Sequence, residues 1–160
     1  MANQLDDLDR KILDIMQGNG RISNAQLAER ISLSPAATHK RLKRLEQEGY
    51  IEGYYAKINR RKLGYRMLCY IHISIKTHSR DELNKFREML KEMPEVLACS
   101  FVTGEFDYVV KVAIRDEADL ESFILNKITP VPGVSQVSTR LVVAEIKNGT
   151  TLPVHITQKD

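Results

Sequence analysis

The chain has 160 residues, of which 42% are hydrophobic and 28% charged, so it is long enough for one ordinary domain or two small ones with packed cores. No N-terminal stretch combines positive charge with an apolar run, and no apolar run approaches the length of a membrane span. The two cysteines, Cys69 and Cys99, form no CxxC motif and have no histidine at ligand spacing. We therefore expect a cytoplasmic protein with no membrane partner, whose cysteines are reduced core thiols.

The net charge of +3 is unevenly distributed. Residues 34–62 carry eight basic and three acidic side chains, whereas residues 1–33 and 63–160 each carry one more acidic than basic side chain. A local excess of positive charge favours a polyanionic partner for that segment.

Residues 5–16 are predicted to form the first helix. Asp6 or Asp7 can cap its start, where acidic side chains also complement the helix dipole, and Gly18 and Gly20 end it. One face is apolar, with Leu8, Ile12, Ile15 and Met16. This helix is expected to support the elements that follow.

Residues 21–51 are typical of two helices joined by a short turn. Ser23 can cap the first helix, and Gln26 completes a capping box. Ser34 can cap the second helix, and Pro35 suits its first position, where no backbone N–H is needed. Together these features predict a helix-turn-helix motif.

The second of these helices has an apolar side, formed by Thr38, Leu42 and Leu45, and a basic side. Small residues near its start allow close approach to a partner, and its cations can neutralise phosphates. An ordinary solvated amphipathic helix would show the same charges, but the two caps and the turn favour a recognition helix that reads double-stranded DNA in the major groove. The predicted DNA contacts are Ser34, Pro35, Ala36, Ala37, His39, Lys40, Arg41, Lys43 and Arg44.

Residues 50–59 are rich in aromatic and β-branched side chains, which is typical of a short strand. Gly49 can cap the recognition helix before them, and three consecutive cations at 60–62 offer further phosphate contacts. We expect residues 1–50 to form the helix-turn-helix domain and residues 51–64 a wing or linker strand.

From residue 65 the pattern changes to strands alternating with helices. Alternating apolar residues predict a first strand at Cys69–Ile75, and Gly104 with Glu105 between two β-rich runs predicts a tight hairpin. The other expected elements are helices at 79–93 and 116–129 and strands at 96–103, 106–114 and 134–146. The order βαββαβ over residues 65–147 predicts a ferredoxin-like sandwich, so the whole chain is α+β.

Both helices of such a sandwich lie on one face of the sheet. Leu68, Tyr70 or corresponding residues on the other face are expected to be buried by a second copy of the chain, which gives a homodimer. The tail, residues 148–160, is polar, although residues 152–156 can add an edge strand.

Two groups of short motifs carry a family resemblance. The first is Asp9, Ile12-Leu13, Gly20-Arg21-Ile22-Ser23, Leu27, Leu33-Ser34-Pro35, Arg41-Leu42, Leu45-Glu46, Gly49, Ile51 and Gly53-Tyr54. The second is Gly104-Glu105-Phe106-Asp107-Tyr108 and Pro132-Gly133-Val134. With these, nearly the whole chain resembles the leucine-responsive regulatory protein and AsnC (Lrp/AsnC) family of transcription regulators.

The resemblance implies a winged helix-turn-helix domain joined to a domain that binds an amino-acid effector, in homodimers that assemble further, into an octamer. It places the effector between dimers, at Thr103, Gly104, Glu105, Phe106, Asp107 and Tyr108. Gly104 can turn backbone amides toward a carboxylate, and Asp107 can hold an ammonium group. Alternatively, Asp107 only stabilises a turn. No metal and no cofactor are expected.

An enzyme is the rival interpretation. Siroheme decarboxylases resemble the same two-domain architecture, and His39, His72, His78 and His155 are candidate acid–base groups. These histidines are not clustered in the sequence, and the recognition helix is intact and basic. We therefore expect a DNA-binding regulator without catalytic residues.

Overall fold

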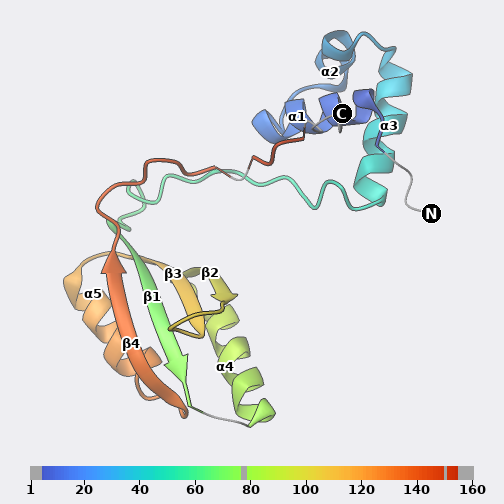
Figure 1. The fold of residues 1–160 in the computed structure, drawn as a ribbon. Helices are drawn as coiled ribbons and strands as arrows, with labels where there is room; N and C mark the ends of the chain where they lie inside the picture. Colours follow the sequence, from blue (N-terminus) through green and yellow to red (C-terminus); the bar gives the residue numbers. More distant parts are fainter. Residues whose placement is uncertain (1–4, 77–78, 150, 155–160) are drawn as a thin grey trace. The chain divides into compact units, whose positions relative to one another are not determined.

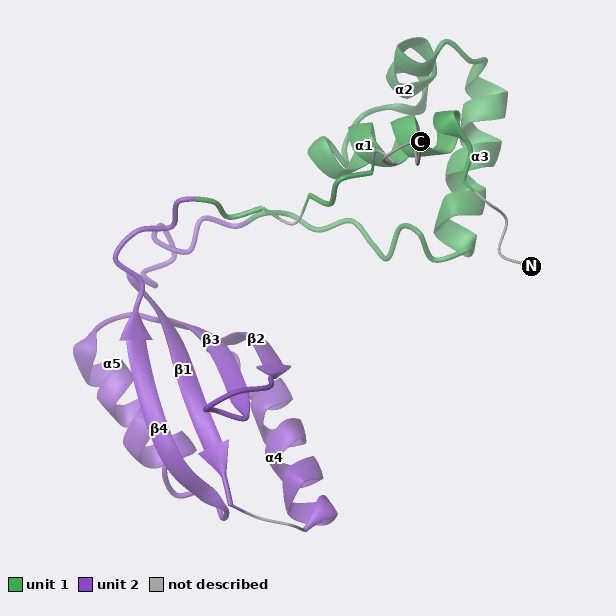
Figure 2. Cartoon of the chain, in the orientation of Figure 1, with its two compact units in different colours: residues 1–57, 147–160 green, residues 58–146 purple. Residues whose placement is uncertain are grey.

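The computed structural model describes residues 5–76, 79–149 and 151–154. The chain divides into two compact units (Figure 2): a helical unit of residues 1–57 and 147–160, and a sheet unit of residues 58–146. Among the described residues, none of the helices is both long and apolar enough to cross a membrane.

The helical unit contains the three predicted helices, α1 (Asp7–Gly18), α2 (Asn24–Ile31) and α3 (Pro35–Gln47) (Figure 1). Each begins at a polar side chain that accepts a hydrogen bond from a backbone amide of the first turn: Asp6, Ser23 and Ser34. Asp6 and Ser23 belong to complete capping boxes. The predicted caps are confirmed, because each depends only on residues within one turn, although the first helix begins at Asp7 rather than at residue 5.

The core of the helical unit is small and apolar. Its buried members are Ile12, Met16, Leu27, Ile31 and Leu45. Thr38 is also fully buried, and its hydroxyl donates to the carbonyl of Ser34 at 3.0 Å, so no polar group is left unpaired there. The turn between α2 and α3 reverses at Ser32, which has a left-handed φ of 56°.

The predicted wing strand at residues 50–59 is wrong, because this segment is irregular. A strand needs a hydrogen-bonded neighbour, and no described strand pairs with it. Tyr54 instead folds back onto the helical unit, where its hydroxyl donates to Glu46 Oε1 at 2.8 Å. A β-carbon on Gly20 would approach Cδ1 of Tyr54 to 3.2 Å. The glycine therefore makes room for the tyrosine ring.

The sheet unit has four strands, β1 (Met67–Ile75), β2 (Val96–Phe101), β3 (Tyr108–Ile114) and β4 (Val134–Leu141), paired antiparallel in the order β2-β3-β1-β4. One face is covered by α4 (Arg80–Glu92) and by the consecutive helices α5 (Glu117–Ser122) and η1 (Phe123–Ile128) (Figure 1). The predicted ferredoxin-like βαββαβ arrangement is confirmed.

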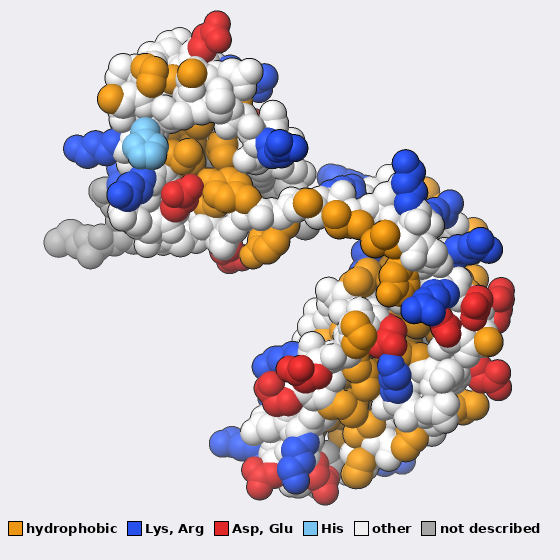
Figure 3. Space-filling model, turned by 180° about the vertical axis from the view of Figure 1, so that it is seen from behind, with side chains coloured by type: hydrophobic (Ala, Val, Ile, Leu, Met, Phe, Trp, Pro, Cys, Tyr) orange, Lys and Arg blue, Asp and Glu red, His pale blue; other side chains and the backbone are white. Residues whose placement is uncertain are grey.

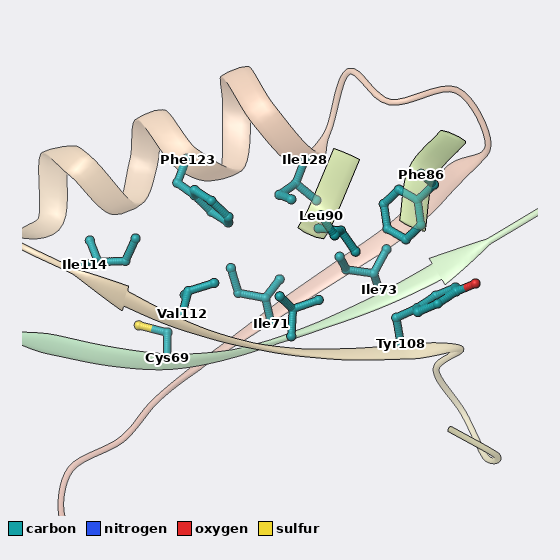
Figure 4. Packing of buried hydrophobic residues seen from close by; sticks show 11 residues of the cluster. Cys69, Ile71, Ile73, Phe86, Leu90, Tyr108, Val112, Ile114, Phe123 and Ile128 are labelled. Carbon is teal, nitrogen blue, oxygen red and sulfur yellow. The ribbon is translucent and has the colours of Figure 1, made fainter. Parts of the chain in front are cut away.

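The core of the sheet unit lies between the sheet and these helices (Figure 4). Alternate residues of β1, Cys69, Ile71 and Ile73, point into it and are fully buried. The helices contribute Phe86, Leu90, Phe123 and Ile128, and β3 contributes Tyr108, Val110, Val112 and Ile114. The period-2 alternation predicted for the first strand is therefore confirmed.

The last helix forms where predicted, but Phe123–Ile128 is a π-helix. Phe123 and Ile128 lie five residues apart and are both buried, which the wider i→i+5 turn of a π-helix permits. Strand β4 ends at Leu141, opposite Cys69, rather than at residue 146, which would need a partner near residue 64, before β1 begins at Met67. Its last ladder bond runs from the amide of Val142 to the carbonyl of Leu68.

The two cysteines lie in different environments. Cys69 is buried in the core as predicted, whereas Cys99 is exposed, so that expectation was wrong. Cys99 lies on β2, the edge strand, where α4 covers the helix-facing side only in part: Leu97 is 54% exposed and Phe101 66%. Burial raises the pKa of the Cys69 thiol.

The tail contacts helix α1 without forming the predicted edge strand. Residues 151–154 are irregular, and residues 155 and 156 lie outside the described residues. Gln17 pairs with both backbone groups of Leu152: its side-chain amide donates to the carbonyl at 2.8 Å, and its side-chain oxygen accepts from the backbone amide at 2.9 Å. Lys57 adds a hydrogen bond to the carbonyl of Asn148 at 3.1 Å.

Candidate DNA-binding and effector-binding sites

The outer face of α3 is exposed and basic. His39, Lys40 and Lys43 are exposed, as are the small residues Ser34, Pro35 and Ala36 at the start of the helix, and Ala37 is half-buried. Figure 3 shows Lys and Arg side chains beside a histidine on the surface of the helical unit. Within the described part of the chain, Lys40 and Lys43 form no ion pair. Their charges are therefore available to phosphates.

Arg41 and Arg44, which were also predicted to contact DNA, are held by α1. Arg41 Nη1 lies 2.6 Å from Asp6 Oδ2 and 2.9 Å from Asp9 Oδ1, and Arg44 Nη2 pairs with Asp9 Oδ2. The side chain of Asp9 is only 1% exposed, whereas the arginines are partly exposed. The structure thus gives both arginines a role in fixing α3 on α1.

The ion pairs change the titration of their members. Hydrogen bonds with Asp6 and Asp9 raise the pKa of Arg41. For Asp6, burial alone would raise the pKa, but the hydrogen bonds from the amide of Asp9 and from Arg41 outweigh it and lower the pKa below 3.8. Sequence analysis missed this cluster, although an aspartate on the buried face of the first helix was a signal for it.

Two further contacts restrict which residues can meet a partner. Asn24 of α2 donates to the carbonyl of Pro35 at 2.8 Å and so fixes the start of α3. Arg60, one of the three cations after the helix, donates to the carbonyls of Tyr65 and Arg66 and pairs with Glu145 at 3.3 Å. Its neighbours at 61 and 62 remain exposed.

The loop that carries the predicted effector residues is wider than the predicted two-residue hairpin. Residues 102–107 connect β2 and β3, and the amide of Val102 donates to the carbonyl of Asp107 at 2.8 Å. Thr103, Gly104 and Glu105 are exposed at the tip, and Gly104 has a φ of +124°. The φ of Gly104 is positive, as predicted for the turn, and the carbonyl of Glu105 accepts a hydrogen bond from Ser74 Oγ of β1 at 3.5 Å.

Asp107 closes the end of β1. Its amide donates to the carbonyl of Ile73 at 3.0 Å, and its Oδ2 accepts from the amide of Ile75 at 2.8 Å. The carboxylate therefore stabilises the turn, as the alternative interpretation stated. These contacts leave Oδ1 without a protein partner among the described residues.

Phe106 and Tyr108 are largely packing residues. Phe106 is buried with its ring centroid 5.3 Å from that of His72, and Tyr108 packs against Phe86 at 5.1 Å. The Tyr108 hydroxyl accepts a hydrogen bond from Arg87 Nε at 3.0 Å. Tyr108 thus faces α4 and not the loop tip, and Arg87 is its neighbour there, which sequence analysis missed.

Of the four histidines of the enzyme interpretation, the structure describes two. His39 lies on α3 in the helical unit and His72 on β1 in the sheet unit. His78 and His155 lie outside the described residues. Among the residues that the structure describes, no group of three His, Cys, Asp or Glu side chains could hold a metal ion.

Comparisons with known proteins match both domains of the chain. Residues 5–52 match a family described as winged helix-turn-helix DNA-binding, and residues 68–152 match the Lrp/AsnC ligand binding domain. The leucine-responsive regulatory protein of Escherichia coli is 33% identical over 153 residues, 96% of this chain and 93% of its own length. The Bkd operon transcriptional regulator of Pseudomonas aeruginosa is 33% identical over 143 residues, 89% and 94% of the two chains.

Solved structures of related regulators have the same fold. A transcriptional regulator of Neisseria meningitidis in complex with L-Met superposes with a TM-score of 0.91 at 34% identity, covering 94% of this chain and 97% of that one. AsnC of E. coli gives a TM-score of 0.84 at 29% identity, covering 94% and 100%. The protein is therefore a DNA-binding transcriptional regulator with an amino-acid-responsive ligand-binding domain and not an enzyme, and it belongs to the Lrp/AsnC family.

Proposed function

We propose that α3 reads the major groove through Ser34, Pro35, Ala36, Ala37, His39, Lys40 and Lys43, while Arg41 and Arg44 mainly hold the helix in place. The observation that supports this division is the pairing of both arginines with Asp9, whereas Lys40 and Lys43 form no ion pair with any described residue. We also propose that the protein acts in the cytoplasm.

Salt dependence tests this division. Removing one phosphate-neutralising cation should lower the slope of log affinity against log salt by about 0.9, so Lys40→Ala with Lys43→Ala should lower it by nearly 2. Lys85→Ala, an exposed cation on α4, is the matched control and should leave the slope unchanged. An unchanged slope in the double variant would rule out this face of α3 as the DNA-binding surface.

We propose that an amino-acid effector binds at the tip of the 102–107 loop, with its carboxylate on backbone amides at Thr103–Glu105 and its ammonium on Oδ1 of Asp107. The positive φ of Gly104 and the oxygen left open on Asp107 support the proposal, as does the L-Met complex of the N. meningitidis relative. The effector would alter DNA binding only through different affinities for different assemblies.

Calorimetry with L-Met and L-Leu tests this site. Asp107→Asn keeps an acceptor for the amide of Ile75 but removes the charge, so it should weaken effector binding at least tenfold. Asp81→Asn makes the same change at an exposed aspartate in the first turn of α4 and is the matched control, which should bind the effector as the wild type does. If Asp107→Asn bound the effector with wild-type affinity, the effector site would not include Asp107.

We propose that the uncovered face of the sheet forms a homodimer, which assembles further into an octamer. Tyr70, 37% exposed, and the partly exposed His72 and Val109 lie on this face. Leu68, also predicted to need a second copy, is only 2% exposed within its own chain. Tyr70→Glu should shift the sedimentation coefficient to that of a monomer, whereas an unchanged coefficient would exclude this face.

A further inference from the structure

The groove between α4 and the edge strand β2 is apolar on most of its surface. It has a volume of about 400 Å³, and its apolar walls include Leu90, Leu97 and Phe101. Its only charged lining residues are Arg87 and Lys91, and no acidic residue among those described lines it. Such a surface complements an anion with an apolar body.

Arg87 is the cation that the groove holds in place. Its Nε donates to the Tyr108 hydroxyl at 3.0 Å, and its guanidinium carbon lies 5.8 Å from the ring centroid of Phe101 and 6.0 Å from that of Tyr108. Lys91 is paired with Glu88 at 2.7 Å, whereas Arg87 has no carboxylate partner within the described residues. The two rings and the hydroxyl orient the guanidinium and leave its terminal nitrogens for a ligand.

We propose that this groove binds a small aliphatic carboxylate, with the carboxylate on Arg87 and the hydrocarbon chain on Leu90, Leu97 and Phe101. A planar guanidinium matches a carboxylate with two parallel hydrogen bonds. The groove has no acidic group for an ammonium, and Arg87 and Lys91 would repel one. The site therefore prefers an acid without an amino group, in contrast to the loop beside Asp107, and it does not depend on the proposed amino-acid site.

Cys99 provides a reporter for occupancy, because it lines the groove and is exposed while Cys69 is buried. In the full-length native protein, Ellman's reagent should react with Cys99. The rate of this reaction should fall when 4-methylpentanoate fills the groove. Leucine has the same carbon skeleton with an ammonium, and 4-methylpentanamide lacks the charge. Both should require at least tenfold higher concentrations for the same protection.

Substitution of the cation separates this site from others. Arg87→Gln should raise the concentration of 4-methylpentanoate needed for half-protection at least tenfold. Lys85→Gln, on α4 but outside the groove, and Asp107→Asn should leave it unchanged. Equal protection by the acid and the amide, or wild-type protection in Arg87→Gln, would overturn the proposal. So would protection that grows with protein concentration alone, because a second copy would then cover the groove.

Discussion

Arg44 of α3 donates a hydrogen bond to Asp9 of α1, across 35 residues of sequence, and the aspartate that accepts it is almost completely buried. One carboxylate thereby pairs with two arginines and with the backbone amide at the start of its own helix. The recognition helix is oriented by this charge as well as by its apolar face.

Asp9→Asn should destabilise the helical unit by roughly 2–4 kcal/mol, because it removes the buried partner of two cations. Urea unfolding followed by circular dichroism measures the loss. Asp7→Asn is the matched control: Asp7 is exposed in the same first turn, so it should cost at most about 1 kcal/mol through the helix dipole. Equal effects of the two substitutions would show that the ion pairs contribute nothing specific.

Low pH should also weaken the helical unit. Because the folded-state pKa of Asp6 is lowered, the unfolded chain binds its proton first as the pH falls, so stability declines once the pH drops below the ordinary value of 3.8. Melting temperatures between about pH 5 and pH 2.5 should fall less in Asp6→Asn than in the wild type. Parallel curves would mean that Asp6 does not titrate with folding.

Tyr54 provides a test at high pH. Burial, followed by the hydrogen bond to the Glu46 carboxylate, raises the pKa of Tyr54 to about 12. Its contribution to stability is present below the ordinary value of 10.0 and is lost as the pH rises through about 12. Glu46→Gln should bring the pKa back toward 10.0, as measured by tyrosinate absorbance with Tyr54→Phe as the subtraction control. A wild-type pKa close to 10.0 would contradict the prediction, because it would mean that the hydroxyl is exposed to solvent.

Gly104→Val should strain the loop, since a β-branched residue disfavours a φ of +124°. We expect the sheet unit to lose about 1–3 kcal/mol of its free energy of unfolding. We also expect effector binding to weaken more than it does in Asp107→Asn. Thr103→Val, one residue earlier at an ordinary φ, should leave stability within about 0.5 kcal/mol of the wild type. Thermal unfolding measures both.

Features set by neighbouring residues could be predicted from the sequence, and features set by distant contacts could not. The helix caps at Asp6, Ser23 and Ser34 are local, and so is the alternation along β1. The connection between β2 and β3 was predicted to have two residues, but it is longer. Asp107 is not part of β3, because it bonds the amide of Ile75, 32 residues away. The arginines of α3 were assigned wholly to DNA because their partner lies on a different helix.

The returning tail makes the helical unit discontinuous in sequence. The chain leaves that unit after Lys57 and re-enters it at Lys147. In the re-entering segment, Leu152 forms two hydrogen bonds with the side chain of Gln17. A fragment cut after Lys57 would expose the surface of α1 on which that segment lies. Proteolysis of one connection would leave the two units joined through the other, so their covalent separation requires two cuts.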